Sequence, residues 1–193
     1  CTLLLLGQKP QRTVDLAAVE ARCPKRGPRH SKQEDHLLFG PRWQVVEQAS
    51  YGAGEAVAHL RLPDAAAGDL DLIGLHPALV DLGTGFAMDL IAGYTGEVLW
   101  VPIGYERIRV HAHLPQQIVS VVTVRPGSSE ASGFARFDIT LTDPAGRVLV
   151  EVDEFSIKRL DGPIDLTPGG AASADDVQFD IDLHSDRHLS KSE

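Results

Sequence analysis

The sequence is short of cysteine, of basic residues and of long apolar runs, and each shortage excludes a class of protein. Its 193 residues include two cysteines, Cys1 and Cys23, which excludes a disulfide framework and a zinc ribbon and favours a reducing, cytoplasmic setting. Lys and Arg number 18 against 27 Asp and Glu, giving a formal net charge of -9. This charge argues against nucleic acid or an anionic membrane surface as a partner. No apolar stretch approaches the roughly 20 residues of a membrane span, and the apolar start lacks the basic lead-in of a signal peptide.

The apolar residues that are present predict one α+β domain. They make up 43% of the chain, which is typical of a globular protein with a substantial core. Residues 77–91 predict a helix that is apolar nearly all round and therefore buried, with Pro77 in its first turn. After that helix the apolar period changes to two, which indicates antiparallel strands. Strands are expected at 55–62, 98–101, 108–114, 118–124, 134–141 and 148–160, with a turn at 143–146.

The remaining segments are assigned from their breakers and caps. Residues 14–23 predict a short helix with Asp15 near its start. Residues 31–38 predict another, with Ser31 as its cap. Residues 64–71 are expected to form a loop of small residues. Residues 161–193 are interpreted as an acidic linker or tail.

Asp81 is the most informative residue, because it is a carboxylate in the middle of a segment, Leu75 to Ile91, that is otherwise almost wholly apolar. A buried carboxylate is costly unless it is paired, or neutral and at work. One interpretation makes Asp81 a structural helix residue that is partly exposed or favoured by the helix dipole. The other makes it a carboxylic acid whose apolar surroundings let it donate a proton. The residues alone leave both open.

A glycine-rich stretch from Val80 to Ala87 imitates the cofactor turn of methyltransferases that use S-adenosylmethionine. His76-Pro77 stands where the preceding strand should run, and proline disrupts a central strand. Antiparallel strands follow, rather than alternating strands and helices. The methyltransferase interpretation is kept as a remote alternative, since a lone glycine motif is a weak signal.

No metal site is predicted. His111 and His113 lie two apart on an expected strand and share a face, but that face also carries arginines, and no carboxylate or cysteine nearby completes a site. Both histidines are expected to face solvent. Trp43 and Trp100 line a pocket or fill the core.

Five segments, in order, resemble the C-terminal half of the dehydratase domain of modular polyketide synthases. That family has a double hot-dog fold, two copies of a long helix wrapped by an antiparallel sheet. "DLAAVEARCP" (15–24) resembles the connector between the halves, and "FGPRW" (39–43) the Tyr-Gly-Pro-x-Phe motif that opens the second half. "LHPALVD" (75–81) resembles the His-Pro-x-x-x-Asp motif of the second helix. "LWVPIGYERIRVH" (99–111) resembles the following strand pair, and the segment 137–160 the closing hairpin.

The resemblance implies a reaction in which Asp81 is the general acid. A His from the upstream half removes the α-proton of a 3-hydroxyacyl thioester, and the Asp protonates the leaving hydroxyl. The implied partners are an acyl carrier protein, the upstream half and neighbouring synthase domains, with a homodimer left open. No metal or organic cofactor is implied, because the phosphopantetheine arm belongs to the carrier.

Three departures from the family pattern set limits on this expectation. The first-half motif His-x-x-x-Gly-x-x-x-x-Pro is absent, since Val45 stands where the proline would follow His36 and Gly40. The chain should therefore not dehydrate alone. Gly85 stands where the family often has Gln or His, one turn after the Asp. Phe39 replaces the tyrosine of the opening motif and has no hydroxyl to offer.

The expected organisation is a connector at 1–30, a C-terminal hot-dog subdomain at 31–160 and the tail. The alternatives are a double-bond isomerase or a pyran-forming cyclase on the same fold, and a catalytically silent module that supports assembly or holds acyl chains. Around Asp81, the residues expected to shape the site or line an acyl tunnel are Phe39, Gly40, Pro41, His76, Pro77, Gly85, Trp100, Val101 and Pro102.

Overall fold

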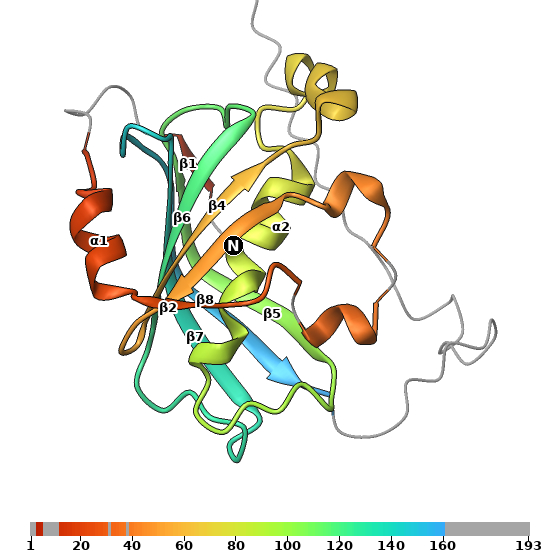
Figure 1. Cartoon of the computed structure of the whole chain (residues 1–193), viewed down its shortest axis with the longest axis vertical. Coiled ribbons are helices and arrows are strands. Elements are labelled where there is room, and N and C mark those ends of the chain that lie inside the picture. The colour runs from red at the N-terminus through yellow and green to blue at the C-terminus, as the bar shows by residue number, and fades with distance from the viewer. Residues whose placement is uncertain (1–2, 6–11, 31, 38, 161–193) are drawn as a thin grey trace, which may run out of the picture. The chain divides into compact units, whose positions relative to one another are not determined.

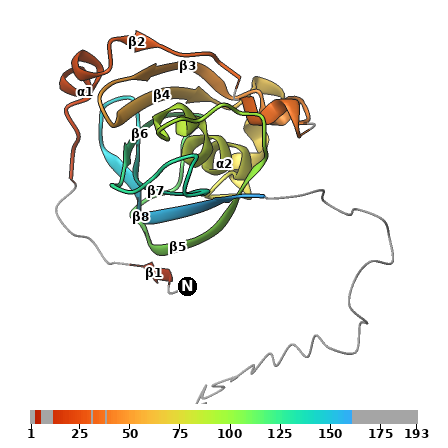
Figure 2. The ribbon, with the colours of Figure 1, turned by 90° about the horizontal axis from the view of Figure 1, so that it is seen from below.

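A curved sheet wraps around one central helix, and this arrangement confirms the predicted α+β class (Figures 1 and 2). The computed structural model describes residues 3–5, 12–30, 32–37 and 39–160. Within them the sheet has eight strands in the order β1-β5-β8-β7-β6-β4-β3-β2. All neighbouring strands are antiparallel except β1 and β5. The strands are β1 Leu3–Leu5, β2 Lys25–Arg26, β3 Val46–Tyr51, β4 Glu55–Arg61, β5 Trp100–Val110, β6 Gln117–Val124, β7 Phe134–Thr142 and β8 Val148–Arg159.

The helices are short, and most of them lie in connections between strands. The α-helices are α1 Leu16–Arg22 and α2 Pro77–Gly85. The 3-10 helices are η1 Lys32–Asp35, η2 Pro41–Trp43, η3 Asp64–Asp71 and η4 Phe86–Leu90. No helix in these described ranges is long and apolar enough to cross a membrane.

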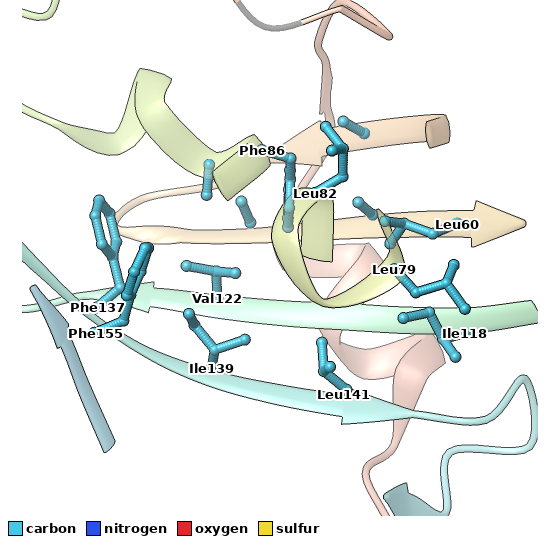
Figure 3. Close-up of a cluster of buried hydrophobic side chains, with 14 of the residues drawn as sticks. Leu60, Leu79, Leu82, Phe86, Ile118, Val122, Phe137, Ile139, Leu141 and Phe155 are labelled. Carbon is cyan, nitrogen blue, oxygen red and sulfur yellow. The ribbon is translucent and has the colours of Figure 1, made fainter. Parts of the chain in front are cut away.

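The core lies between α2 and the concave face of the sheet. Figure 3 shows Leu79 of α2 directed at Ile118, within a cluster that joins Leu79, Leu82 and Phe86 of the helical segment to side chains of the strands. Those strand residues include Leu60, Ile118, Val122, Ile139 and Leu141, and all are buried. Burying each such side chain contributes about 1.5–3 kcal/mol, so this contact fixes the position of α2 inside the sheet.

Helix α2 begins where the sequence predicts and ends earlier. His76 is its N-cap, with Nδ1 accepting a hydrogen bond from the Ala78 backbone N–H at 3.3 Å, and Pro77 takes the first helical position. The α-helix ends at Gly85, and η4 follows it with Ala87 at φ -87° and ψ 25°. The predicted helix over 77–91 is therefore too long, because apolar residues at the same spacing continue through the 3-10 turn.

Two neighbouring elements also differ from their predictions. Residues 64–71, expected to be a loop, form η3. The separate strands expected at 98–101 and 108–114 are one strand, β5, whose pairing with β8 shifts register between Pro102 and Gly104. A proline cannot donate to the ladder, so the irregularity falls where Pro102 interrupts the pattern. His111 and His113 lie beyond the end of β5.

Other predictions are met in part or in full. Helix α1 matches the expected helix at 14–23, with Asp15 Oδ1 accepting from the Ala18 N–H at 3.0 Å. The strands at 55–62, 118–124, 134–141 and 148–160 and the turn at 143–146 are confirmed within one or two residues. Of the helix expected at 31–38, only η1 is present in the described residues, and Ser31 lies outside them. The tail at 161–193 and most of 1–11 also lie outside. Strand β3 has no counterpart among the predicted elements.

Candidate functional site

Asp81 lies on the face of α2 that the sheet does not cover. Its neighbours Leu79 and Leu82 are buried, whereas Asp81 and Pro77, one turn apart, are exposed. The Asp81 carboxylate is nevertheless paired, because the Trp43 indole Nε1–H donates a hydrogen bond to Oδ2 at 2.9 Å. Of the two interpretations left open by the sequence, the exposure of Asp81 in this chain matches the partly exposed helix residue and not the buried carboxylate. Asp81 is a surface carboxylate held by an aromatic donor.

Trp43 reaches Asp81 because the opening segment folds into a tight turn. Gly40 is the N-cap of η2 and Pro41 its first residue, and the Trp43 N–H donates to the Gly40 carbonyl at 2.9 Å. On the other side of the turn, the Val45 N–H donates to the Trp43 carbonyl at 2.9 Å. The turn therefore fixes the backbone of Trp43 from both directions.

A polar bridge ties this turn to the start of α2. The Asp69 carboxylate of η3 accepts from Arg42 Nε at 3.0 Å and lies 3.4 Å from His76 Nε2, both contacts through Oδ2. Since His76 Nδ1 accepts from the helix backbone, its Nε2 carries the hydrogen. The hydrogen bond to His76 and the Arg42 guanidinium lower the pKa of Asp69 despite an opposing contribution from burial. Two expected motifs, 39–43 and 75–81, are thus joined by Arg42, Asp69 and His76 as well as by Trp43 and Asp81.

Some of the expected site residues line one cavity with Asp81. This cavity has a volume of about 140 Å³ and is mostly apolar. The structure brings Phe39, Gly85, Trp100 and Pro102 to its wall. Gly40, Pro41, His76, Pro77 and Val101 are not on the wall. His76 is 2% exposed and serves as a helix cap, Gly40 and Pro41 build the turn, and Val101 lies in β5 opposite Lys158.

A second cavity adjoins the first. It has a volume of about 410 Å³, and Leu37, Phe39 and Leu82 line both cavities. Trp43 lines the larger cavity and Asp81 the smaller, so their hydrogen bond spans the boundary between them. Arg29 and His30 make part of the wall of the larger cavity polar and basic.

Sequence reasoning missed Gln33, which braces the smaller cavity. Its side chain is 8% exposed. Its Oε1 accepts from the Trp100 backbone N–H at 2.6 Å, and its Nε2 donates to the Tyr94 hydroxyl at 2.7 Å. Gln33 thereby ties the segment before the opening motif to the start of β5. A lone glutamine in a short polar turn gives no sequence signal for this role.

Two aromatic residues of the site carry polar groups. The Trp100 ring is 5% exposed, and its Nε1 has no hydrogen-bond partner among the described residues. Tyr105 stacks on the cavity residue Phe155 with ring centroids 5.0 Å apart. Burial raises the pKa of Tyr105, and the charge of Asp81 raises it further. Tyr105 therefore lies within the electrostatic reach of Asp81, which sequence reasoning did not anticipate.

The histidine pair does not form a metal site in this structure. His111 Nε2 lies 2.9 Å from Glu151 Oε2, so the expectation that no carboxylate stands nearby is wrong. Both histidines are exposed, as expected. Across the part of the chain that the structure describes, no group of three or more His, Cys, Asp or Glu side chains could hold a metal ion.

The glycine-rich stretch from Val80 to Ala87 does not form a cofactor turn after a strand. It lies within α2 and η4. The strands of the sheet around this helical segment, β4, β6, β7 and β8, pair with their neighbours in antiparallel fashion. The strand, turn and helix that the methyltransferase motif requires are therefore not present at this position.

Comparison with known proteins points to one family. A family model described as "Polyketide synthase dehydratase N-terminal domain" matches residues 11–166. Polyketide synthase PksM of Bacillus subtilis (strain 168) is 27% identical over 131 residues, which cover 65% of this chain and 3% of PksM.

Solved dehydratases share the fold. The dehydratase domain from the CurF module of curacin polyketide synthase matches with a TM-score of 0.70 and 22% identity, over 80% of this chain and 55% of that one. Two structures of the CurK dehydratase match with TM-scores of 0.69, at 21% and 19% identity, again over 80% of this chain and 55% of theirs. They are described as inactive mutants, one with Asp replaced by Asn and one with His replaced by Phe. The chain spans about half the length of these solved dehydratases.

Proposed function

Because this chain belongs to the polyketide synthase dehydratase family, whose model matches residues 11–166, we propose that it is the C-terminal hot-dog half of such a dehydratase. The observation that carries the proposal is the Asp81 carboxylate at the wall of an apolar cavity. The matching model is described as an N-terminal domain. We assign the C-terminal half instead from the order of the 39–43 and 75–81 motifs and from the hydrogen bonds that join them.

The proposed reaction is the elimination of water from a 3-hydroxyacyl chain carried on an acyl carrier protein. A His of the upstream half takes the α-proton, the electrons of that C–H bond form the new C=C bond, and the C–O bond at the β-carbon breaks. Asp81 gives its proton to the departing hydroxyl, which leaves as water. A positioned acid and base that act on the two neighbouring carbons suit this chemistry, which uses no metal or organic cofactor.

The exposure of Asp81 suggests that the upstream half covers this carboxylate in the complete dehydratase. A general acid works best where water is excluded, but this chain leaves Asp81 at its surface. An upstream half that packs over this face of α2 would enclose the carboxylate and bring the base to it. The substrate would lie with its acyl chain in the cavity of about 140 Å³ and its phosphopantetheine arm along the larger one.

The solved relatives support the pairing of an acid with a base. In the CurK dehydratase, the structures with Asp replaced by Asn and with His replaced by Phe are both described as inactive. Asp81 stands in the motif that resembles the family's Asp, so it is the residue of this chain to which we carry that role.

The test is a dehydration assay of the longest polypeptide that contains the upstream half together with this chain. A 3-hydroxyacyl carrier protein is the substrate, and the loss of one water is followed by mass. We expect Asp81→Asn to lower kcat by at least about a hundredfold, since general acid catalysis contributes about 10²–10⁴.

Asp89→Asn is the matched control, because Asp89 is also exposed and pairs with Lys32 at 3.3 Å. It should leave the rate within about twofold. Equal rates for wild type and Asp81→Asn would refute the role of Asp81. No water loss from folded wild type over several chain lengths would indicate a silent module.

Phe39 favours a second candidate function, an isomerase or cyclase on the same fold. It lines the cavity beside Asp81 and lacks the hydroxyl of the family's tyrosine. A site altered in this way could move a double bond or close a pyran ring by adding a hydroxyl to the new alkene. Isomerisation and ring closure change no mass after the water is lost, so mass alone does not distinguish them. Determining the structure of the product in the same assay separates the outcomes.

A further inference from the structure

We propose that Trp43 is the residue that positions the Asp81 carboxylate for proton transfer, in place of a side chain missing at Gly85. This inference rests on the proposed function and goes beyond it, because it assigns a positioning residue in the opening motif. Its basis is the hydrogen bond from Trp43 Nε1–H to Asp81 Oδ2 at 2.9 Å, between residues 38 apart in the chain.

Trp43 is the one hydrogen-bond partner of the Asp81 carboxylate within the described residues. Thr84, which also lines the cavity, donates its hydroxyl to the Asp81 backbone carbonyl at 3.1 Å and not to the carboxylate. Gly85 lies four residues after Asp81, where a longer side chain could reach the carboxylate along the helix. A Cβ built on Gly85 meets no atom within 4 Å, so the space is open and unused.

The chemistry of the indole determines which carboxylate oxygen can carry the proton. An indole N–H donates and cannot accept, so Oδ2 must act as the acceptor in this pair. When Asp81 is protonated, its hydrogen is therefore directed to Oδ1. The hydrogen bond thus holds one oxygen and leaves the other to face the substrate, which is what a general acid needs.

The indole itself is held firmly enough to do this. The backbone of Trp43 makes a hydrogen bond in each direction, to the Gly40 carbonyl and from the Val45 N–H. The adjacent Arg42 binds Asp69, which also contacts the N-cap residue of α2. The donor and the carboxylate therefore belong to one braced unit, and the orientation of Asp81 depends on this unit and not on its own helix alone.

The kinetic test uses Trp43→Phe, Gly85→Gln and the double variant, in the same polypeptide that contains the upstream half. Phenylalanine keeps an aromatic ring and removes the N–H. We expect Trp43→Phe to lower kcat about ten- to a hundredfold, the size expected for a hydrogen bond to a charged group, with KM within about twofold. Gly85→Gln in that background should restore kcat to within about threefold of wild type, because the amide can donate from the open space.

Thermal unfolding of each variant separates positioning from packing. A Trp43→Phe variant that loses activity, melts like wild type and is rescued by Gly85→Gln supports the proposal. Loss of activity that follows loss of stability without rescue, or full activity of Trp43→Phe, overturns it.

A second readout does not depend on activity. The indole ¹H–¹⁵N signal of Trp43, assigned by its loss in Trp43→Phe, should move as the pH is changed and should stop moving in Asp81→Asn. The charge of Asp81 raises the pKa of Tyr105, so Tyr105→Phe is the control and should leave the movement intact. If wild type fails to dehydrate, the proposed function fails while this signal still decides the Trp43–Asp81 pair. A signal that is the same at every pH and in Asp81→Asn overturns the pair.

Discussion

Single residues at this site divide into those that hold the fold and those that face a cavity. His76 and Asp81 stand five residues apart, yet His76 is buried as a helix cap while Asp81 is exposed at a cavity wall. Asp69 links the cap to Arg42 and so to the turn that carries Trp43. We therefore expect substitutions at His76 to act on stability first and on chemistry second.

His76 provides the test at this scale. His76→Ala removes the side chain that accepts from the Ala78 N–H at 3.3 Å and empties a buried position. We expect the free energy of unfolding to fall by about 1–3 kcal/mol, the range for a lost cap or a buried group left unsatisfied. Urea unfolding followed by circular dichroism measures it.

His76→Asn is the matched control for that variant. Asparagine is a good N-cap, so it should recover part of the loss. A His76→Ala protein that is as stable as wild type but inactive would instead place His76 among the substrate-binding residues.

The secondary-structure elements show what the sequence can and cannot specify. The start of α2 is predictable because Pro77 and the apolar spacing are local signals. Its end is not, because the apolar spacing continues through Phe86 and Met88, which are buried in the 3-10 helix η4. Strand β3 escapes prediction because its letters, Val-Glu-Gln-Ala-Ser-Tyr, lack a clear period of two.

The site follows the same division between local and long-range signals. Asp81 stands out because it is a charge in an apolar segment. Its partner Trp43 does not, because 38 residues separate them and the tertiary fold alone brings them together. The resemblance to a family therefore singled out Asp81 as the proposed acid, while the structure was needed to find the side chain that holds its carboxylate.

The packing of α2 on the sheet gives a prediction at the element scale. Leu79 is fully buried against the strands (Figure 3). Leu79→Ala should lower the free energy of unfolding by about 2–5 kcal/mol, because it removes buried methyl groups and leaves a cavity. Chemical denaturation of the two proteins side by side gives this difference.

The same substitution at an exposed leucine is the control. Leu72 is 90% exposed, so Leu72→Ala should change stability by no more than about 0.5 kcal/mol. Similar losses for both variants would mean that Leu79 does not carry the core contact that the structure assigns to it.

The stability of the whole molecule depends on pH through carboxylates that pair with basic side chains of neighbouring strands or of the β7–β8 turn. Burial pushes the pKa values of Asp138, Asp143 and Glu151 upward, but hydrogen bonds from Arg125, Arg147 and His111 outweigh it, so all three pKa values are lowered. Each group binds protons less readily in the folded chain than in the unfolded one. The stability that they contribute is therefore present above the unfolded carboxyl pKa of about 4 and is lost as the pH falls through the lower folded values.

This predicts unfolding by acid. The urea midpoint should stay level from about pH 7 to about pH 5 and fall steadily below about pH 4, where the unfolded chain takes up more protons. Asp143→Asn should lower the midpoint at neutral pH and make the fall in acid smaller, because one of the titrating groups is gone. A midpoint that is independent of pH down to about pH 2 would contradict this account.

The stretch before α1 is fastened to residues 146–151, and this has a consequence for the time course of synthesis. The Val14 N–H donates to the Gly146 carbonyl at 2.8 Å, the Val148 N–H donates to the Arg12 carbonyl at 2.9 Å, and Arg12 pairs with Glu151, 139 residues later. At the roughly 5–20 residues per second at which chains are made, those partners emerge about 7–28 s after Arg12. During that interval residues 12–14 lack these partners, whereas Arg22 of α1 can already meet Glu55, only 33 residues after it, so the connector-like segment is fastened to the sheet from its C-terminal side first.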